Sequence, residues 1–480
     1  MTPIVGFAPD ADSTTAGVLT DCEHMIPALT GMVAAPTPQV ADGVAALGAE
    51  CKGAAVLTKM DGARRVIAGT AAALYELSGA SWTDVSESGG YTVGADARWS
   101  LAQFGNDTIA ANSADPLQKS TTGAFASIDG APTAKIVFTV KDFVMAMNTT
   151  SNADEWYCSA AFDAADWVTS IDTQCTKGRL VATNGAITAG ARLGEYAIAY
   201  KSRSLYIGQY VGAPAVWQWQ QVSGGDAGCV GQEALCDIGG AHFFVGESGF
   251  YLFDGTRPVP VADGQVRQWF LDYSDPNYRY RTKCVYDNQN DRVWIFYPAK
   301  GSSTCDSALV WHTKSKMWGR SNRSIEAVLN YISAGVTIDG LTSLASTIET
   351  LPNVAFDSQY WLSGGRALSI INTSHQLQLL TGAAGASSMT SGDYGDDVAV
   401  TRLQRVRIRY AAGQGPTTAT VTTYAKMNSG EDFVQKSSGT LADGKFDVRQ
   451  SGRWHRVKVS FTGDVKVVGA IADYVQAGSR

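Results

Sequence analysis

The sequence has few charged residues, few prolines and no long hydrophobic run. Charged residues make up 17% of its 480 positions, and proline occurs only 14 times. Because 45% of the residues are apolar and 10% are aromatic, the composition excludes a disordered chain, which would be more charged and poorer in aromatics. No stretch of 18 apolar residues is present, so we expect no transmembrane helix. The first ten residues lack a basic and an apolar segment, so we expect no secretory signal peptide.

The motifs of common catalytic sites are also missing. The sequence contains no G-x-S-x-G, H-E-x-x-H, P-loop or C-x-x-C motif, and no G-x-G-x-x-G that opens a helix. It has only five histidines, and its eight cysteines are scattered, so we expect reduced thiols. Cys229, Cys236 and His242 are spaced more widely than zinc ligands usually are, which favours buried thiols over a metal site. The sequence therefore predicts no enzyme activity, no cofactor and no metal.

One acidic stretch could supply the paired carboxylates of a glycosidase. Such enzymes need two carboxyl groups at a defined separation, which a sequence does not reveal. The residues that could provide them are Asp154, Glu155, Asp163, Asp166 and Asp172. A solvated loop is the favoured interpretation of this stretch.

Glycine, tryptophan and tyrosine are abundant, and they recur in a repeating pattern. The 50 glycines, 12 tryptophans and 19 tyrosines are typical of short strands joined by tight turns. Equivalent strands begin near residues 143, 197, 243 and 293, a spacing of about 50 residues that is typical of four-stranded blades. The sequence thus predicts an all-β fold with a β-propeller of five to seven degenerate blades. Two or three β-sandwiches are the alternative.

The chain divides into four predicted parts. Residues 1–52 contain five prolines and predict an extended N-terminal arm. Residues 53–380 predict the propeller, with Tyr360–Leu362 as a strand of one more blade. Residues 381–397 are rich in glycine, serine and alanine and predict a linker. Residues 398–480 predict a C-terminal antiparallel β-sheet or sandwich.

The C-terminal part is predicted to have a basic face. Apolar and basic residues alternate with period two along two of its segments, so each strand is expected to be half buried. The basic positions are Arg405, Arg407, Arg409, Arg453, Arg456 and Lys458. They could face solvent, a neighbouring subunit or the phosphates of DNA. Residues 401–480 carry 13 basic and 6 acidic residues, whereas the rest of the chain carries 25 and 39.

Several segments resemble the nozzle, or tail-hub, proteins of short-tailed bacteriophages. They are residues 64–79, 82–86, 99–106, 131–135 and 447–459. The resemblance implies a structural β-propeller protein that forms a ring, commonly a homohexamer, below the portal and adaptor proteins. The ring would continue the channel for double-stranded DNA and help to retain and release the genome. Tail fibres or spikes would attach around it.

The resemblance also implies where the protein is located, and an alternative function stays open. The protein would reside in the virion tail and assemble in the cytoplasm of the bacterial host. The six basic residues would line the DNA channel or a subunit interface, and no catalytic residue carries over. The alternative is a propeller-class tail protein that degrades or binds polysaccharide.

Overall fold

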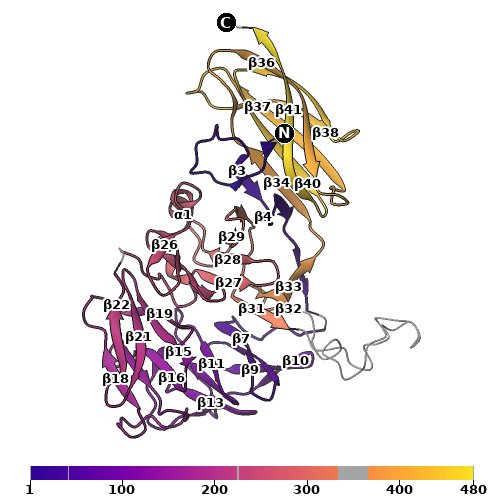
Figure 1. The fold of residues 1–480 in the computed structure, drawn as a ribbon. Helices are drawn as coiled ribbons and strands as arrows, with labels where there is room; N and C mark the ends of the chain where they lie inside the picture. The colour runs from indigo at the N-terminus through magenta and orange to yellow at the C-terminus, as the bar shows by residue number, and fades with distance from the viewer. Residues whose placement is uncertain (1, 42, 224–225, 333–365, 479–480) are drawn as a thin grey trace.

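The computed structural model describes residues 2–41, 43–223, 226–332 and 366–478, and these residues are almost entirely β. They form two units, a β-propeller and a β-sandwich, with the N- and C-terminal ends of the chain both in the sandwich (Figure 1). The single α-helix in the described residues is α1 (Arg267–Tyr273). The predicted fold class, an all-β propeller with a C-terminal antiparallel β region, is confirmed. None of the described helical residues forms a helix long and apolar enough to cross a membrane.

The propeller is built from four-stranded antiparallel blades. Five of them use strands that are consecutive in the chain: β7 (Gly53–Thr58) to β10 (Ser81–Asp84), β11 (Ser100–Phe104) to β14 (Ala126–Ser127), β15 (Ala134–Val140) to β18 (Thr176–Arg179), β19 (Ile187–Leu193) to β22 (Val216–Gln221), and β23 (Leu235–Asp237) to β26 (Pro258–Pro260). Between these lie β8 (Arg64–Gly69), β9 (Leu74–Ser78), β12 (Asp107–Ala111), β13 (Gln118–Ser120), β16 (Phe143–Thr149), β17 (Glu155–Cys158), β20 (Tyr196–Lys201), β21 (Leu205–Gly212), β24 (His242–Gly246) and β25 (Gly249–Phe253).

Two further four-strand units complete the ring. One of these units is a separate sheet of four strands. It consists of β31 (Ala327–Ile332), β32 (Arg366–Ile371), β33 (Leu377–Gly382) and, from the N-terminal segment, β6 (Thr37–Val40). The other unit consists of β27 (Lys283–Asp287), β28 (Arg292–Tyr297), β29 (Ser307–His312) and β30 (Trp318–Arg320), and it continues into a larger sheet. Because β31 contacts β7, the last and first blades meet and the ring is closed. The expected strand Tyr360–Leu362 lies outside the described residues.

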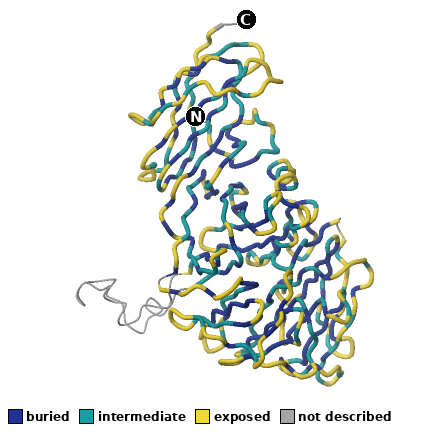
Figure 2. Tube along the Cα trace, turned by 180° about the vertical axis from the view of Figure 1, so that it is seen from behind, coloured by how far each residue is buried: buried dark blue, intermediate teal, exposed yellow. Residues whose placement is uncertain are grey.

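Alternation along the strands explains how the blades stack. In β15, Ile136 and Phe138 point into the core shared with the β19–β22 blade, whereas Val137 points into the core shared with the β11–β14 blade. Each blade packs between two neighbouring blades, so a polar face would leave the apolar face of one neighbour uncovered. Both faces of a blade must therefore be apolar. Buried residues accordingly follow the strands of both units, and exposed residues gather in the loops (Figure 2).

The sandwich consists of two facing sheets. One contains β5 (Met32–Ala34), β41 (Lys466–Gly478), β36 (Val400–Tyr410) and β39 (Phe446–Gly452), with β1 (Thr2–Pro3) on β41. The other contains β2 (Gly6–Phe7), β3 (Val18–Glu23), β34 (Ala386–Ser391), β40 (Trp454–Thr462), β37 (Thr418–Lys426) and β38 (Val434–Thr440), with β35 (Tyr394–Gly395) on β40. Val406 and Phe446 from the first sheet share a core with Val421 and Val459 from the second.

The N-terminal segment, predicted as an extended arm over residues 1–52, is woven into both units. Its strands β1, β2 and β3 belong to the sandwich, and β6 closes the propeller. Between them, β4 (Met25–Pro27) and β5 join β30 of the propeller to β41 of the sandwich, which produces one ten-stranded sheet. The prolines do not prevent this pairing, because the strands concerned are only two to four residues long.

Residues 381–397, predicted as a linker, contain strands β34 and β35, so this expectation is corrected. Ser387 and Met389 are buried, and β34 pairs with both β3 and β40. The small residues serve close packing here. A Cβ atom on Gly392 would lie 2.2 Å from the Ser13 carbonyl oxygen, and one on Gly395 would lie 1.8 Å from that of Arg453.

Candidate functional site

The six basic residues predicted as a site lie on two sheets that face each other. Arg405, Arg407 and Arg409 lie on β36, in the first sheet of the sandwich, whereas Arg456 and Lys458 lie on β40, in the second. The apolar residues that alternate with them point into the shared core. The two basic rows therefore point outward on opposite sides of the sandwich, and the structure does not bring the six cations together on one face.

Acidic residues of the same chain contact three of these cations. Arg405 Nε donates to Asp447 at 2.9 Å, and Arg407 lies 3.3 Å from Asp473. On the other sheet, Arg456 Nη2 lies 2.8 Å from Asp393. The Arg405 hydrogen bond holds the pKa of Asp447 below its usual range.

The second basic row borders a hollow on the outer side of β40. Lys458 and Arg456 line it together with Lys426. The ring of Phe433 packs between two of these cations, 4.3 Å from the Arg456 guanidinium carbon and 4.6 Å from Lys426 Nζ. Arg453 lies between β39 and β40, outside both sheets, and contacts Asn428 at 3.5 Å.

Four of the five predicted carboxylates accept hydrogen bonds from neighbouring groups, and the fifth residue, Asp172, has its backbone nitrogen bonded to Ser170 Oγ in the same loop. Asp154 accepts hydrogen bonds from Arg179, which lowers its pKa. Glu155 is buried and bonded to Thr149. Asp163 and Asp166 each accept a hydrogen bond from the backbone nitrogen two residues later. Such bonds stabilise turns.

Cys229, Cys236 and His242 do not form a metal site. His242 Nε2 donates to the Arg192 carbonyl at 2.9 Å, and its Nδ1 accepts from the Tyr200 hydroxyl at 2.8 Å. Both ring nitrogens are therefore occupied. The described residues contain no group of three or more potential metal ligands. All eight cysteines are free, and burial raises the pKa of the Cys229 thiol to about 12.

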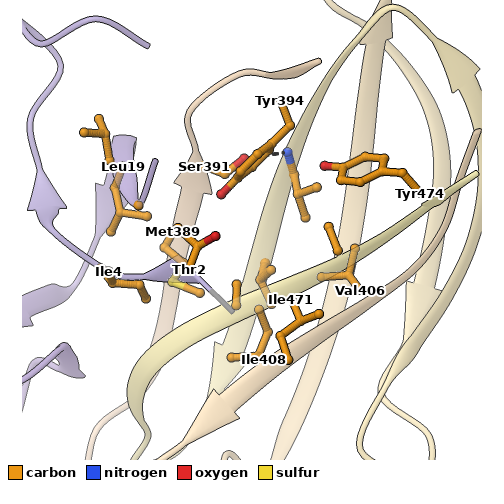
Figure 3. A pocket seen from close by; sticks show the side chains of 16 residues that line it. Thr2, Ile4, Leu19, Met389, Ser391, Tyr394, Val406, Ile408, Ile471 and Tyr474 are labelled. Carbon is orange, nitrogen blue, oxygen red and sulfur yellow. Dashed lines mark hydrogen bonds between the residues drawn. The ribbon is translucent and has the colours of Figure 1, made fainter. Parts of the chain in front are cut away.

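An apolar cavity of about 170 Å³ lies between the two sheets of the sandwich (Figure 3). Tyr394 and Tyr474 lie at one end of it, and Ile408 and Ile471 lie at the other. Burial raises the pKa of Tyr394, as expected for a phenol in apolar surroundings. The cavity offers apolar contact, two phenol groups and the hydroxyls of Thr2 and Ser391.

A charged cluster lies at one end of the propeller axis, where the first strands of the blades begin. The residues that precede or open β7, β11, β15, β23, β27 and β31 meet there, because consecutive first strands surround the axis. We call this group the axial cluster. It consists of Glu50, Lys52, Asp96, Arg98, Lys135, Glu233, Tyr280, Arg281, Lys283, Glu326 and His375.

Ion pairs in the axial cluster connect blades that are not adjacent in the chain. Arg281, before β27, bonds to Asp96, before β11, and Tyr280 donates to the same carboxylate at 2.9 Å. These hydrogen bonds lower the pKa of Asp96. Arg98 Nε lies 3.9 Å from Glu233, which in turn bonds to Lys283. Side chains from distant blades therefore meet across this end of the axis.

Other contacts join the last blade to the first. Glu326 accepts a hydrogen bond from the Cys51 backbone nitrogen at 2.8 Å and contacts His375 Nδ1 at 2.8 Å. Arg98 Nη1, before β11, lies 3.5 Å from Glu50, before β7, and so joins the second blade to the first.

Two hollows lie within the axial cluster, one of about 420 Å³ and one of about 50 Å³, and Arg98 and Arg281 line both. Sequence reasoning missed this cluster because its residues have no common motif or spacing.

Comparisons with known proteins support no functional assignment. No family profile and no curated protein matches the sequence. Among solved structures, the chain is similar to the computationally designed Ika8 protein, with 8% identity, a TM-score of 0.37, and 70% of this chain and 98% of that chain covered. It is also similar to YCF48 bound to a D1 peptide, with 12% identity, a TM-score of 0.35, and 70% of this chain and 94% of that chain covered. A third similar structure is PorZ of Porphyromonas gingivalis, with 11% identity, a TM-score of 0.37, and 85% of this chain and 51% of that chain covered. At these values the likenesses carry no argument about function.

Proposed function

We propose that this chain is a structural protein of a short-tailed bacteriophage tail, the nozzle or tail hub. Its subunits would form a ring, commonly a homohexamer, that continues the DNA channel below the portal and adaptor and helps to retain and release the genome. Tail fibres or spikes would attach to the ring in the virion. The proposal rests on the resemblance of the segments given above, and one exposed loop of the propeller supports an assembly role.

That loop joins β17 to β18, the two outermost strands of one blade. It exposes three large apolar side chains, Phe162, Val168 and Ile171, whose exposed fractions are 77%, 71% and 62%. The loop is nevertheless ordered, because Trp167 is buried beneath it and donates from Nε1 to the Ala164 carbonyl. An ordered surface with several exposed apolar side chains is typical of a contact with another protein.

Backbone geometry at the tip of this loop supports the same interpretation. Phe162 has a φ of 62°, a left-handed conformation that bulky residues rarely adopt. Its backbone nitrogen donates to the Asp142 carbonyl at 2.8 Å, which fixes the strained residue in place. Strain of this kind is concentrated at functional positions. By contrast, four of the five carboxylates on which the polysaccharide-degrading alternative depends are bonded within turns or to neighbouring side chains.

Assembly can be tested on the full chain, mixed with the portal and adaptor proteins of a short-tailed phage. We expect native mass spectrometry to show a ring, and imaging to show it below the adaptor. A triple variant, Phe162→Ser, Val168→Ser and Ile171→Ser, should weaken assembly at least about tenfold, because buried aromatic anchors dominate protein contacts. Met60→Ser, at an 83% exposed residue in another blade, is the matched control.

Two outcomes would contradict the proposal. One is a chain that stays monomeric in the presence of the portal and adaptor. The other is a triple variant that assembles as well as the unmodified protein does.

A further inference from the structure

The axial cluster contains more positive charge than its own acids neutralise. Around the smaller hollow lie three cations, Arg98, Lys135 and Arg281, and two acids, Asp96 and Glu233. Asp96 bonds to Arg281 and Tyr280, and Arg98 lies 3.5 Å from Glu50 and 3.9 Å from Glu233, which also bonds to Lys283. One positive charge therefore remains available at the hollow.

Lys135 supplies this charge. It lies on β15, and within the described residues its ammonium group makes no hydrogen bond, while the Asp96 carboxylate, already bonded to Arg281 and Tyr280, acts on it at longer range. Burial lowers its pKa, which shows that the amine is partly withdrawn from water. Removing an ammonium group from water costs free energy when it gains no hydrogen bond in exchange. An anion placed beside Lys135 would offset that cost.

Arg281 adds a fixed donor next to Lys135. Its Nη1 donates to the Ser303 carbonyl at 2.5 Å, and its guanidinium packs against the rings of Tyr278 and Tyr280 at 5.0 and 5.7 Å. Its Nε is buried and has no hydrogen-bond partner in the part of the chain that the structure describes. The backbone next to Arg281 is closely packed. The chain at Gly231 approaches Tyr280 so nearly that a Cβ atom on Gly231 would lie 1.9 Å from the Tyr280 carbonyl oxygen.

The two hollows differ in size and in chemistry. The smaller one, about 50 Å³, has room for one compact charged group, given that a water molecule occupies about 30 Å³ in the liquid. The larger one, about 420 Å³, is lined by hydrogen-bonding groups that include Ser303, Thr304 and His375. Its volume is in the range of small-molecule sites. Arg98 and Arg281 border both.

From this arrangement we infer that the axial cluster binds a small hydroxylated molecule that carries one carboxylate or phosphate group. The anionic group occupies the smaller hollow beside Lys135 and Arg281. The hydroxylated body occupies the larger hollow and bonds to the polar groups there. Arginine and lysine around a single anionic group provide charge-assisted hydrogen bonds, which are stronger than neutral ones.

The test is ligand-observed NMR and calorimetry on the full chain at low salt with three probes. Glucuronate carries a carboxylate, glucose 6-phosphate carries a phosphate, and glucose carries neither. We expect at least one acid to bind and glucose to bind at least about tenfold more weakly. The stronger of the two acids identifies which anionic group the site takes.

Lys135→Gln separates a binding role from a purely structural one. Because Lys135 makes no hydrogen bond within the described residues, this change should leave the melting temperature nearly unaltered and weaken acid binding at least about tenfold. Lys316→Gln is the control, since burial also lowers the pKa of Lys316, whose side chain is more exposed than that of Lys135 and packs on Trp311, away from the axis. The inference is wrong if neither acid binds, if glucose binds as tightly as the acids, or if Lys135→Gln binds them normally.

Discussion

At the scale of single residues, His242 shows how burial fixes a protonation state. The side chain is fully buried in β24 and uses one nitrogen as donor to Arg192 and the other as acceptor from Tyr200. Only neutral imidazole can do both. Burial lowers the pKa of His242 below its ordinary value of 6.5.

This arrangement predicts a loss of stability in mild acid. As the pH falls below 6.5, the unfolded chain takes up a proton on His242 before the folded chain does, so the free energy of unfolding decreases. Urea titrations between pH 7.5 and 5 should show the decrease. His242→Asn should reduce its slope and should also cost about 1–3 kcal/mol at pH 7.5, because the buried Tyr200 hydroxyl and the Arg192 carbonyl lose their bonds.

Tyr200→Phe provides the control. It removes only the hydroxyl that donates to Nδ1, so stability should fall at every pH while the acid-dependent decrease persists. If the free energy of unfolding of His242→Asn changes with pH as it does in the unmodified protein, the pH dependence comes from other groups. His455 is then the next candidate, since burial also lowers its pKa.

At the scale of elements, the closure of the propeller depends on one short strand. β6 has four residues and pairs with β33, so that Gln39 faces Leu379 and Val40 faces Gln378. Sequence position separates these partners by some 340 residues. The last blade lacks its outer strand without this pairing.

A disulfide between these strands should therefore stabilise the whole ring. Cα atoms of directly opposed residues in antiparallel strands lie about 4.5–5.5 Å apart, which suits a disulfide. Gln39→Cys combined with Leu379→Cys should form one on oxidation and raise stability by about 2–4 kcal/mol, because it closes a very long loop. Calorimetry before and after reduction measures the gain. Equal melting temperatures in the two states would show that strand β6 does not limit unfolding.

Elements also show how far the sequence could predict the fold. The 50-residue recurrence and the alternation in Arg405–Arg409 were sufficient for the propeller and for a half-buried C-terminal strand, because both patterns are local. β6 could not be predicted, since Thr37–Val40 contains a proline and its apolar pattern is too short to have a period. The small residues at 381–397 predict a linker, whereas in the structure they permit close strand contact.

The candidate sites show the same limit. The alternation along two segments predicts one basic face, but the basic residues of β36 and β40 lie on two facing sheets, and only the pairing of these strands with different neighbours reveals this. The axial cluster could not be predicted at all. Asp96 and Arg281 meet only because the ring brings the beginnings of their strands to one axis.

At the scale of the whole molecule, the propeller is an insertion within the sandwich. Residues 2–34 and 384–478 contribute to the sandwich, and the propeller strands lie between them. Leu19 and Met32 from the N-terminal part share the sandwich core with Val406 and Val459. The C-terminal part alone therefore has an incomplete core.

A fragment of residues 384–480 should consequently fail to fold by itself. It would expose the apolar side chains that Leu19 and its neighbours cover, so we expect broad NMR signals and no cooperative melting transition. Addition of a peptide of residues 1–35 should restore dispersed signals, because it supplies β1, β2, β3 and β5. A fragment that melts cooperatively without the peptide would show that the C-terminal strands suffice.

The pairing of Thr2 with Ala470 also sets an order of events during synthesis. Ribosomes add about 5–20 residues per second, so roughly 25–95 s pass between these two partners. Throughout that time the first strands have open edges, and an open edge can pair with another chain. A polypeptide that stops early leaves both the sandwich and its own N-terminal strands unsatisfied. The sandwich therefore cannot be completed before β41 has been synthesised, and nascent chains need protection until that strand emerges.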